Sequence, residues 1–402
     1  MKRRFTLFTL IMFCMASLVL MPTLAQNQND RPNQEGNGKL RRHQKPIPGH
    51  YIVVLDQDEV GDASLNSQKA HELGAAYGAE VTDFFPSVLA GFSARMSEEQ
   101  AERLSEDPSV AFVEEDGIME IAATQSNAPW GLDRIDQRDR PLNGTYSYTR
   151  TGSGVNVYII DTGIRRTHTQ FGGRAFVGFD AIGDGRNTSD CNGHGTHVAG
   201  TVGGSTYGVA KGVRLFAVRV LNCSGQGSTS GVISGVNWVT SNHTKPAVAN
   251  MSLGGGISSS LDTAVRNSIA AGVTYAVAAG NSNVDASNSS PARVSEAITV
   301  GSSTINDGRS SFSNFGSVVD VFAPGSSITS AWHTSDTATA TISGTSMASP
   351  HVAGVAARVL QGSPGSSPAT VRNSIVNAAT TNRLSGIPSG TANRLLFWSS
   401  AQ

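Results

Sequence analysis

The sequence predicts an α/β fold with a mostly parallel central sheet flanked by helices, preceded by a small α+β domain. Apolar runs recur beyond residue 125 and alternate with stretches of helical pattern. Such runs are typical of strands that are buried on both faces of a parallel sheet. We expect these strands at 155–160, 215–221, 247–251, 273–278 and 298–300.

A shorter series of elements comes before them, between residues 47 and 119. Its patterns predict a strand, a helix, a strand, a helix and a strand, in that order. The second helix starts with Ser97 and two glutamates, which is a capping pattern. The five elements are expected at 51–55, 66–77, 89–96, 97–105 and 110–115.

The amino terminus predicts an export signal at residues 1–25. Basic residues at 2–4 precede an apolar run at 5–21, and small residues lead to a cleavage site after Ala25. A membrane anchor is the alternative, but the run barely reaches spanning length and polar residues follow it. Lipidation at Cys14 fits poorly, because a bulky residue precedes it. We therefore expect a soluble protein that is secreted to the extracellular space.

Three segments follow the signal. Residues 26–45 are polar and have almost no apolar side chains, which predicts an unfolded linker. Residues 46–124 would form the small domain, and residues 125–402 the large one. The polar junction at 123–127 is expected to be exposed and open to proteolytic processing.

Charge and cysteine content narrow the choice of partners and compartment. The sequence holds 30 Lys and Arg against 31 Asp and Glu, a formal net charge of -1, so it offers no long-range field for nucleic acid or an acidic membrane. We expect no nucleic-acid partner, no membrane partner after signal removal, and by default a monomer. Once Cys14 is removed, Cys191 and Cys223 remain. An even number in an exported protein predicts one disulfide, with a buried free pair as the alternative.

Asp161 is the first candidate for chemistry. It follows a buried strand directly, at the carboxyl end where open α/β sheets build their sites. A structural capping role is the alternative. An aspartic protease would need a second Asp-Thr/Ser-Gly sequence, which this chain lacks.

His194 is the second candidate, at the start of a small-residue helix. Glycines on both sides would let its imidazole approach other backbone closely. His197 lies three residues on, so a metal site is the alternative, but the Glu of a His-Glu-x-x-His zinc motif is missing. We interpret His197 as a structural helper.

Ser346 is the third candidate, near the amino end of a helix that runs to about residue 360. Unpaired N–H groups and the positive end of the helix dipole favour a developing oxyanion there. Pro350 is tolerated because it falls early in the helix. A serine that merely caps the helix is the alternative.

Together these residues supply a nucleophile, a base and an orienting carboxylate. Their order, Asp, His, Ser, differs from the order in α/β-hydrolases, and no Gly-x-Ser-x-Gly elbow occurs. His194 would take the Ser346 proton and later protonate the leaving amine, while Asp161 would fix the tautomer and stabilise the imidazolium.

Three strings resemble the signature motifs of the subtilisin-like serine proteases: Asp161-Thr162-Gly163, His194-Gly195-Thr196-His197-Val198-Ala199-Gly200 and Gly344-Thr345-Ser346-Met347-Ala348-Ser349-Pro350. The resemblance covers residues 130–397 and is nearest to the proteinase K and aqualysin branch, supported by Ser310-Ser311-Phe312-Ser313-Asn314 and the cysteine positions. It implies a subtilisin-like fold and a serine endopeptidase of broad specificity, without a catalytic cofactor.

The resemblance also implies a substrate cleft. Asn281 would complete the oxyanion hole beside the Ser346 N–H, although it could merely close a turn. An edge for an added peptide strand, with a rim opposite and the walls of a roomy first pocket, would hold polypeptide substrates. The edge is assigned to Ser252, Leu253, Gly254, Gly255 and Gly256, and the rim to Ser224, Gly225 and Gln226. Ala278, Ala279 and Gly280, which lead to Asn281, are further substrate-binding residues. Gly227 departs from the aromatic residue that relatives carry in this rim, which leaves the preference further from the cut open.

The small domain resembles the inhibitory propeptide of the same family, especially at 47–55 and 91–94. Such a domain would template folding and then inhibit the site until it is cleaved off. Structural calcium is a further implication, with a solvated acidic face or a helix cap as the alternative. Two ligand sets are expected, the first Asp320 with carbonyls near Ser295 and Ala297, and the second Asp133, Asp136 and Gln137.

Two other classes of protein remain as alternatives to an active serine endopeptidase. One is an inactive scaffold that binds or inhibits, and the other is a metal-dependent hydrolase. Inactive relatives usually lose a member of the triad, whereas this chain retains all three residues and Asn281.

Overall fold

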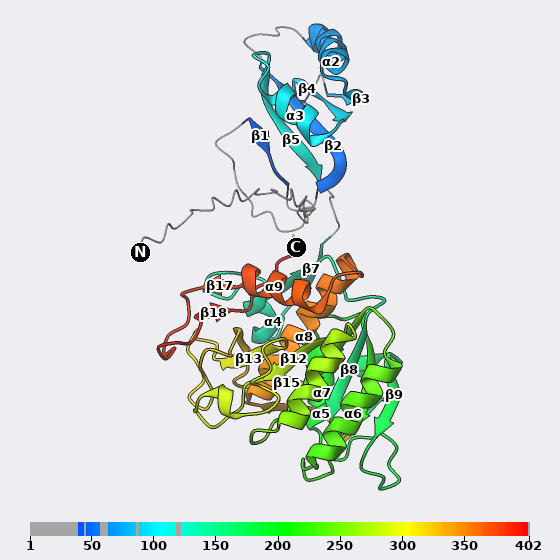
Figure 1. Cartoon of the computed structure of the whole chain (residues 1–402), viewed down its shortest axis with the longest axis vertical. Coiled ribbons are helices and arrows are strands. Elements are labelled where there is room, and N and C mark those ends of the chain that lie inside the picture. The colour runs from blue at the N-terminus through cyan, green and yellow to red at the C-terminus, as the bar shows by residue number, and fades with distance from the viewer. Residues whose placement is uncertain (1–38, 44–45, 57–62, 86–87, 118–121, 401–402) are drawn as a thin grey trace, which may run out of the picture. The chain divides into compact units, whose positions relative to one another are not determined.

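The computed structural model describes residues 39–43, 46–56, 63–85, 88–117 and 122–400, and it divides into two compact units after Gly117 (Figure 1). The predicted export signal and most of the predicted linker lie outside the described residues. No helix in the described ranges is both long and apolar enough to cross a membrane.

Among its described residues, the first unit has a five-stranded sheet, in the strand order β1-β5-β2-β4-β3, and two helices. Buried residues of both helices join the core of the sheet, with Leu73 and Leu104 packing among Val53, Phe92 and Val113. The elements are β1 Leu40–Arg41, β2 Pro46–Leu55, α2 Ala63–Tyr77, β3 Glu80–Phe84, β4 Gly91–Arg95, α3 Glu98–Ser105 and β5 Val110–Gly117.

The five elements predicted for this unit are present. The Ser97 hydroxyl accepts the Gln100 N–H at 3.2 Å, and the Gln100 side chain accepts the Ser97 N–H at 2.7 Å, so α3 begins with a full capping box. Strand β3 was not predicted, since most of its side chains are exposed and give no apolar alternation.

The prediction that residues 26–45 form only a linker is wrong at its carboxyl end. Strand β1 pairs in parallel with β5, and main-chain pairing of this kind does not need apolar side chains. Polar contacts hold the strand further: Lys39 Nζ donates to the Val110 carbonyl at 2.8 Å, and Arg42 lies 3.0 Å from Glu115.

The second unit contains a nine-stranded sheet in the order β17-β18-β14-β13-β12-β11-β8-β10-β9. All neighbouring strands pair in parallel except β17 and β18. The five predicted strands correspond to β8, β10, β11, β12 and β13. The strands are β8 Asn156–Asp161, β9 Ala175–Asp180, β10 Arg214–Arg219, β11 Ala247–Met251, β12 Thr274–Ala278, β13 Ile298–Ser303, β14 Val321–Pro324, β17 Thr380–Thr381 and β18 Arg394–Leu395.

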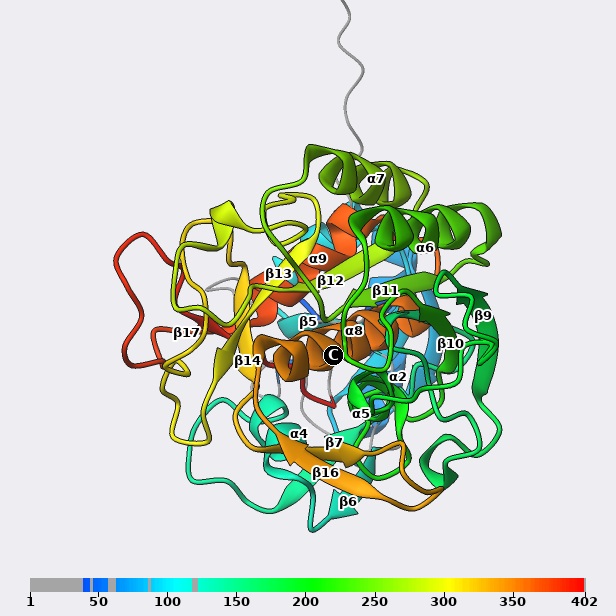
Figure 2. The ribbon, with the colours of Figure 1, turned by 90° about the horizontal axis from the view of Figure 1, so that it is seen from below.

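Helices cover both faces of this sheet, as the alternation along β8 shows. Val157 and Ile159 belong to a core that includes α5, α8 and α9, whereas Tyr158 and Ile160 belong to a core that includes α6 and α7. Figure 2 shows α6 and α7 side by side, in agreement with their contacts. The helices are α4 Trp130–Ile135, α5 His194–Gly203, α6 Thr229–Asn242, α7 Ser259–Ala270, α8 Thr345–Gly362 and α9 Pro368–Ala378.

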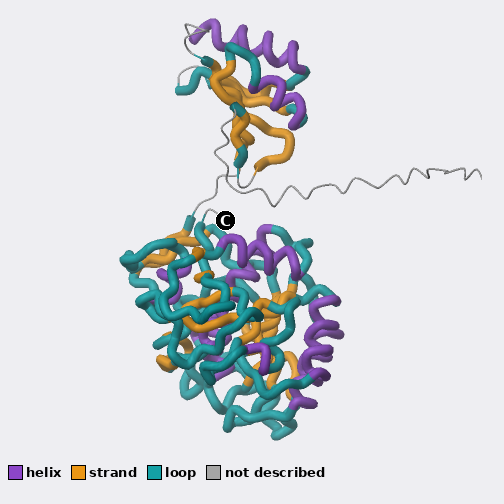
Figure 3. Tube along the Cα trace, turned by 60° about the vertical axis from the view of Figure 1, so that its left-hand side comes forward, coloured by secondary structure: helices purple, strands orange, loops and turns teal. Residues whose placement is uncertain are grey.

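Loops and turns make up much of the second unit (Figure 3). Two small antiparallel pairs lie outside the main sheet, one formed by β15 Ile328–Ala331 and β16 Thr339–Ile342. The other joins β6 Ala123–Ser126 to β7 Thr145–Tyr148. The junction expected to be a simple exposed segment is therefore a paired strand, although three of its four side chains are exposed.

Gly354 should be a glycine for steric reasons. A Cβ added there would lie 2.5 Å from Val209 Cβ and 3.3 Å from the Val202 carbonyl, between α8 and the end of α5. Alanine normally favours a helix interior by about 1 kcal/mol over glycine. We expect Gly354→Ala to lower the free energy of unfolding instead, by about 1 to 3 kcal/mol, because the contact is overpacked.

Thermal unfolding of Gly354→Ala and Gly231→Ala checks this expectation. Gly231 lies in α6, where an added Cβ would meet nothing closer than 3.2 Å. The Gly231→Ala protein should unfold near the wild-type temperature. A Gly354→Ala protein that unfolds at a higher temperature than wild type would contradict the steric argument.

Candidate active site

Asp161 ends strand β8, which lies between β10 and β11 in the sheet. Its side chain is fully buried, and its Oδ1 accepts the Thr162 N–H at 2.7 Å. The parallel strand thus delivers a carboxylate to the carboxyl edge of the sheet, as the sequence predicts.

His194 is the first residue of α5 and faces this carboxylate. Its Nδ1 lies 2.8 Å from Asp161 Oδ1 and 3.0 Å from Oδ2. Burial lowers the pKa of His194, but the charge and hydrogen bond of Asp161, helped by the charge of Asp190, outweigh burial and raise it above 6.5. The imidazole is thus oriented by a carboxylate and suited to accept a proton.

The glycines beside His194 are required by close packing. Gly193 has a φ of +110°, in the left-handed region that favours glycine, and the Trp332 ring fills the space where its Cβ would stand. A Cβ on Gly195 would collide with the Gly163 carbonyl. Both positions are therefore too crowded for a side chain.

Ser346 is the second residue of α8, so its N–H lies in the first turn of a helix of 18 residues. Its hydroxyl donates to the Ser252 carbonyl at 3.1 Å, and the Ser252 hydroxyl donates to the Ser346 carbonyl at 2.8 Å. Within residues 122–400, no hydrogen bond joins the Ser346 hydroxyl to His194. Hydrogen bonds between such groups are often loose without substrate and tighten in the complex.

Asn281 lies shortly after β12. Its side chain is held by Thr345, the residue that precedes Ser346. Its Oδ1 accepts the Thr345 N–H at 2.8 Å and the Thr345 hydroxyl at 2.9 Å, which leaves Nδ2 as the free end of the amide. A Cβ built on Gly344 would lie 3.5 Å from Asn281 Nδ2 and 3.6 Å from the Ser346 nitrogen. Two hydrogen-bond donors therefore border one small space.

Two cavities meet along residues 252–256. The larger, about 600 Å³, is lined by His194 and by Gly225 and Gln226 of the expected rim. The smaller, about 370 Å³, is lined by Ser346, by the substrate-binding candidates Ala278, Ala279 and Gly280, and by Asn281. The segment 252–256 separates the two cavities, so a chain lying along it could place side chains into both.

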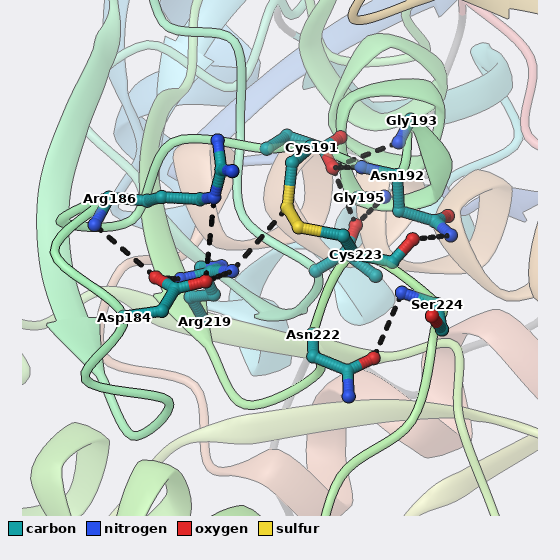
Figure 4. The surroundings of a disulfide bond; sticks show 12 residues. Asp184, Arg186, Cys191, Asn192, Gly193, Gly195, Arg219, Asn222, Cys223 and Ser224 are labelled. Carbon is teal, nitrogen blue, oxygen red and sulfur yellow. Dashed lines mark hydrogen bonds and ion pairs between the residues drawn. A yellow bond between two sulfur atoms is a disulfide. The ribbon is translucent and has the colours of Figure 1, made fainter.

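Two residues of the expected cleft differ from their assigned roles. Gly255 exchanges both main-chain hydrogen bonds with Ser290, at 3.0 and 3.2 Å, so its main chain is not available to an added strand. Ser224 does not line either cavity; its N–H donates to the Asn222 side chain at 2.9 Å and shapes the rim turn (Figure 4).

Cys191 and Cys223 form a disulfide, as predicted (Figure 4). The bond joins the segment before His194 to the rim of the larger cavity. Asn192 adds a second tie, because its Nδ2 donates to the Cys223 carbonyl at 2.9 Å. The buried Arg219 lies beside the Cys191 sulfur and binds Asp184.

Comparison with known proteins agrees with this geometry. The Subtilase family model matches residues 152–394, and the Peptidase inhibitor I9 model matches residues 50–122. This chain belongs to the subtilase family. The family prediction and the fold prediction are both confirmed.

Named relatives narrow the class further. The subtilase is 52% identical over 368 residues to "Extracellular serine proteinase" of Thermus sp. (strain Rt41A), covering 87% of this chain and 90% of the relative. It is 51% identical over 363 residues to "Alkaline serine exoprotease A" of Vibrio alginolyticus, and the match covers 87% of this chain and 67% of that relative. The solved structure of "a cold adapted subtilisin-like serine proteinase" is 58% identical, with a TM-score of 0.66, and covers 68% of this chain and 98% of that one. The chain is thus a serine protease with an inhibitor-type propeptide.

His197 fits a structural role in this subtilase. Its Nε2 lies 3.0 Å from the Ile328 carbonyl, and it is fully buried. Burial, with a smaller contribution from His194, lowers the pKa of His197 to about 4, so the ring is neutral at pH 7. Its hydrogen bond thus attaches α5 to β15.

The first expected calcium site does not fit its surroundings. Asp320 Oδ2 accepts the Thr299 N–H at 2.8 Å, and Oδ1 forms an ion pair with Arg372. A guanidinium therefore already neutralises the Asp320 carboxylate, and we do not retain this site.

The second expected calcium site fits better. Asp136 Oδ1 and Gln137 Oε1 are buried oxygens without a hydrogen-bond partner. Burial, together with the charge of Asp133, raises the pKa of Asp136 to about 6. No cluster of three or more His, Cys, Asp or Glu side chains suited to a metal occurs in the described part of the chain, so a cation here would also need amide and main-chain oxygens.

Asp190 is a residue of this region that sequence reasoning missed. It lies four positions before His194, and its carboxylate binds the first turn of α5. An Asp just before a helix start is a recognisable capping signal.

Proposed function

We propose that this subtilase is a secreted endopeptidase of broad specificity that uses Asp161, His194 and Ser346. The observation that carries the proposal is the Asp161–His194 hydrogen bond at the edge of one cavity, with Ser346 at the edge of the next. Both cavities border residues 252–256, so the three side chains gather around one short segment.

In the proposed reaction the Ser346 Oγ attacks the carbonyl carbon of a peptide bond, and His194 Nε2 accepts the hydroxyl proton. His194 then donates that proton to the leaving amine as the C–N bond breaks, which leaves an ester on Ser346. Water then attacks the ester carbonyl while His194 Nε2 accepts a proton from that water, and His194 donates this proton to Ser346 Oγ as the acid product leaves.

Substrate would be bound mainly through its main chain. The segment around Leu253 and Gly254 presents an edge, and Gly256 has open space where a side chain would be. The 370 Å³ cavity is lined largely by small residues and would accept an apolar or aromatic side chain before the cut. Recognition of this kind tolerates many sequences.

The domain at 46–124 would act as an intramolecular inhibitor and folding template, consistent with the I9 match. The pairing of β6 with β7 favours a cut on the amino side of Ala123, because a cut at residue 125 would remove half of a paired strand. Export by residues 1–25 is supported by a relative that is named extracellular.

Replacement of Ser346 by alanine tests the proposal most directly. The Ser346→Ala precursor should remain joined to its propeptide and should not hydrolyse casein, because no nucleophile is present. Intact mass of the secreted proteins and casein hydrolysis measure both effects. A mutant that matures and digests casein as well as wild type would show that Ser346 is not the nucleophile and would favour a metal-dependent hydrolase instead.

Replacement of Asn281 by leucine tests the oxyanion donor. We expect Asn281→Leu to lower kcat about 10²- to 10³-fold, because a donor that acts on the transition state is lost. Thr345→Val is the matched control, since it removes the hydroxyl bonded to Asn281 and keeps both donors. Its loss should be below about 10-fold. Equal losses in the two variants would mean that Asn281 acts only by supporting Thr345.

Structural calcium is proposed at Asp133, Asp136 and Gln137. The two unpartnered buried oxygens of Asp136 and Gln137 support this assignment. Asp133 accepts the Gly144 N–H at 2.7 Å and would contribute charge at the same turn. A bound Ca²⁺ would hold α4 to the turn before β7 and would take no part in peptide hydrolysis.

Thermal unfolding with and without a chelator checks the calcium proposal. Calcium should raise the wild-type unfolding temperature, since a ligand present at 100 times its Kd stabilises by about 2.7 kcal/mol. Asp136→Asn should remove most of this increment, whereas Asp320→Asn should keep it. An increment that survives in Asp136→Asn would locate calcium elsewhere.

A further inference from the structure

The Asp190 carboxylate is unusually well bound for a loop residue. Its Oδ1 accepts the N–H groups of Asn192 and Gly193 and the Thr162 hydroxyl, each at 2.9 Å. Its Oδ2 accepts the Thr196 N–H at 2.9 Å and the Thr196 hydroxyl at 2.6 Å. Five donors therefore converge on one carboxylate, four residues before His194.

These bonds compensate for a missing cap. Helix α5 begins at His194, and its N-cap residue Gly193 has no side chain to bind the first N–H groups. The first N–H groups, which are bonded by the side chains of Asn192, Thr162 and Asp190, and the positive dipole end make this terminus attract an anion. They also disfavour a positive imidazolium on the first residue of the helix, which is the form that His194 takes after accepting a proton.

Two threonine hydroxyls extend the network to the end of β8. Thr162 Oγ1 accepts the Gly195 N–H at 2.9 Å while it donates to Asp190. Thr196 Oγ1 accepts the Arg165 N–H at 3.0 Å while it also donates to Asp190. The segment that carries Asp161 and the turn that carries His194 are thus joined through the same carboxylate.

We propose that Asp190 is a positioning residue for peptide hydrolysis: it holds His194 against Asp161 and offsets the helix dipole at the imidazolium. The inference rests on the proposed triad. Asp190 does not contact the reacting atoms, and it acts through the position and charge of His194.

The charged surroundings of His194 support an electrostatic part in this role. After burial, which acts in the opposite direction, Asp161 and Asp190 are the charges that raise the pKa of His194. Of the other titratable groups nearby, His197 is neutral at pH 7, and His333 packs against Gly193. The Asp190 carboxylate is therefore the second negative charge, after Asp161, that acts on the His194 imidazole.

The disulfide holds the same segment independently of Asp190. The effect of Asp190 on the charge near His194 can therefore be separated from its effect on the position of the segment. Cys191 and Asn192 are both tied to Cys223 (Figure 4), so the segment stays attached to the rim when Asp190 is changed. The substrate edge at 252–256 receives no hydrogen bond from Asp190. Loss of Asp190 should therefore affect kcat more than KM.

The test compares Asp190→Asn with Asp184→Asn in the full-length chain. Both precursors are matured in trans with a trace of wild-type enzyme, and active sites are counted with a serine-directed phosphonate. Asp184 is the matched control, because it lies in the same loop and pairs with Arg219 rather than with α5. Steady-state kinetics on a peptide substrate are measured across the acid pH range.

We expect Asp190→Asn to lower kcat about 10- to 100-fold, with KM changed by less than about threefold. The acid limb of kcat/KM should move to lower pH, because a neutral side chain no longer favours protonated His194. Thr196→Val keeps the charge of Asp190 but removes one of its hydrogen-bond donors, so it should lower kcat without moving the acid limb of kcat/KM. Asp184→Asn should match wild type in both respects.

Two results would overturn the inference. One is an Asp190→Asn enzyme with kcat within about twofold of wild type. The other is a lower unfolding temperature with an unmoved acid limb, which is the result of a purely structural cap. If Asp190→Asn does not fold, an unaltered kcat in Thr196→Val overturns it equally. Maturation of Ser346→Ala would instead reject the triad and is measured separately.

Discussion

The parallel pairing of β8 between β10 and β11 is the constraint on which the rest of the site depends. It buries Asp161 at the end of a strand whose two faces are both covered by helices. An isolated carboxylate is costly to bury, so hydrogen-bond donors must gather around it. His194 and Thr162 supply them, and the elements that carry these residues are thereby fixed to the sheet edge.

Helix α8 positions the proposed nucleophile and oxyanion donors, and it does so through its amino end rather than through a strand. Its amino end places Ser346 and Thr345 beside the loop after β12, and Thr345 holds the Asn281 amide in one orientation. The nucleophile and the proposed oxyanion donors thus depend on one helix terminus, whereas the base and its carboxylate depend on another terminus and a strand. The segment 252–256 is where the two halves meet.

Much of this arrangement could be predicted from sequence, because buried parallel strands leave long apolar runs and the motifs at Asp161, His194 and Ser346 are local. What could not be predicted depends on main-chain pairing or on partners far along the chain. Strand β1 has only two residues, and strands β3 and β6 are largely exposed, so none of the three leaves a periodic signal. Arg372 lies 52 residues from Asp320 in sequence, so its ion pair with that carboxylate has no local trace. The triad, the oxyanion donor and calcium stay predictions.

The Cys191–Cys223 bond has a consequence for where the enzyme acquires its working shape. Disulfides persist outside the cytoplasm and are rare inside it, where thiols are kept reduced. If the chain is exported as proposed, the segment before His194 and the rim at 222–226 would therefore lack their covalent link while the precursor is in the cytoplasm. The disulfide would form only after the precursor leaves the cytoplasm, and this delay would add to the protection that the propeptide gives by inhibition. Assembly of the cleft would then be completed only where digestion of proteins does the cell no harm.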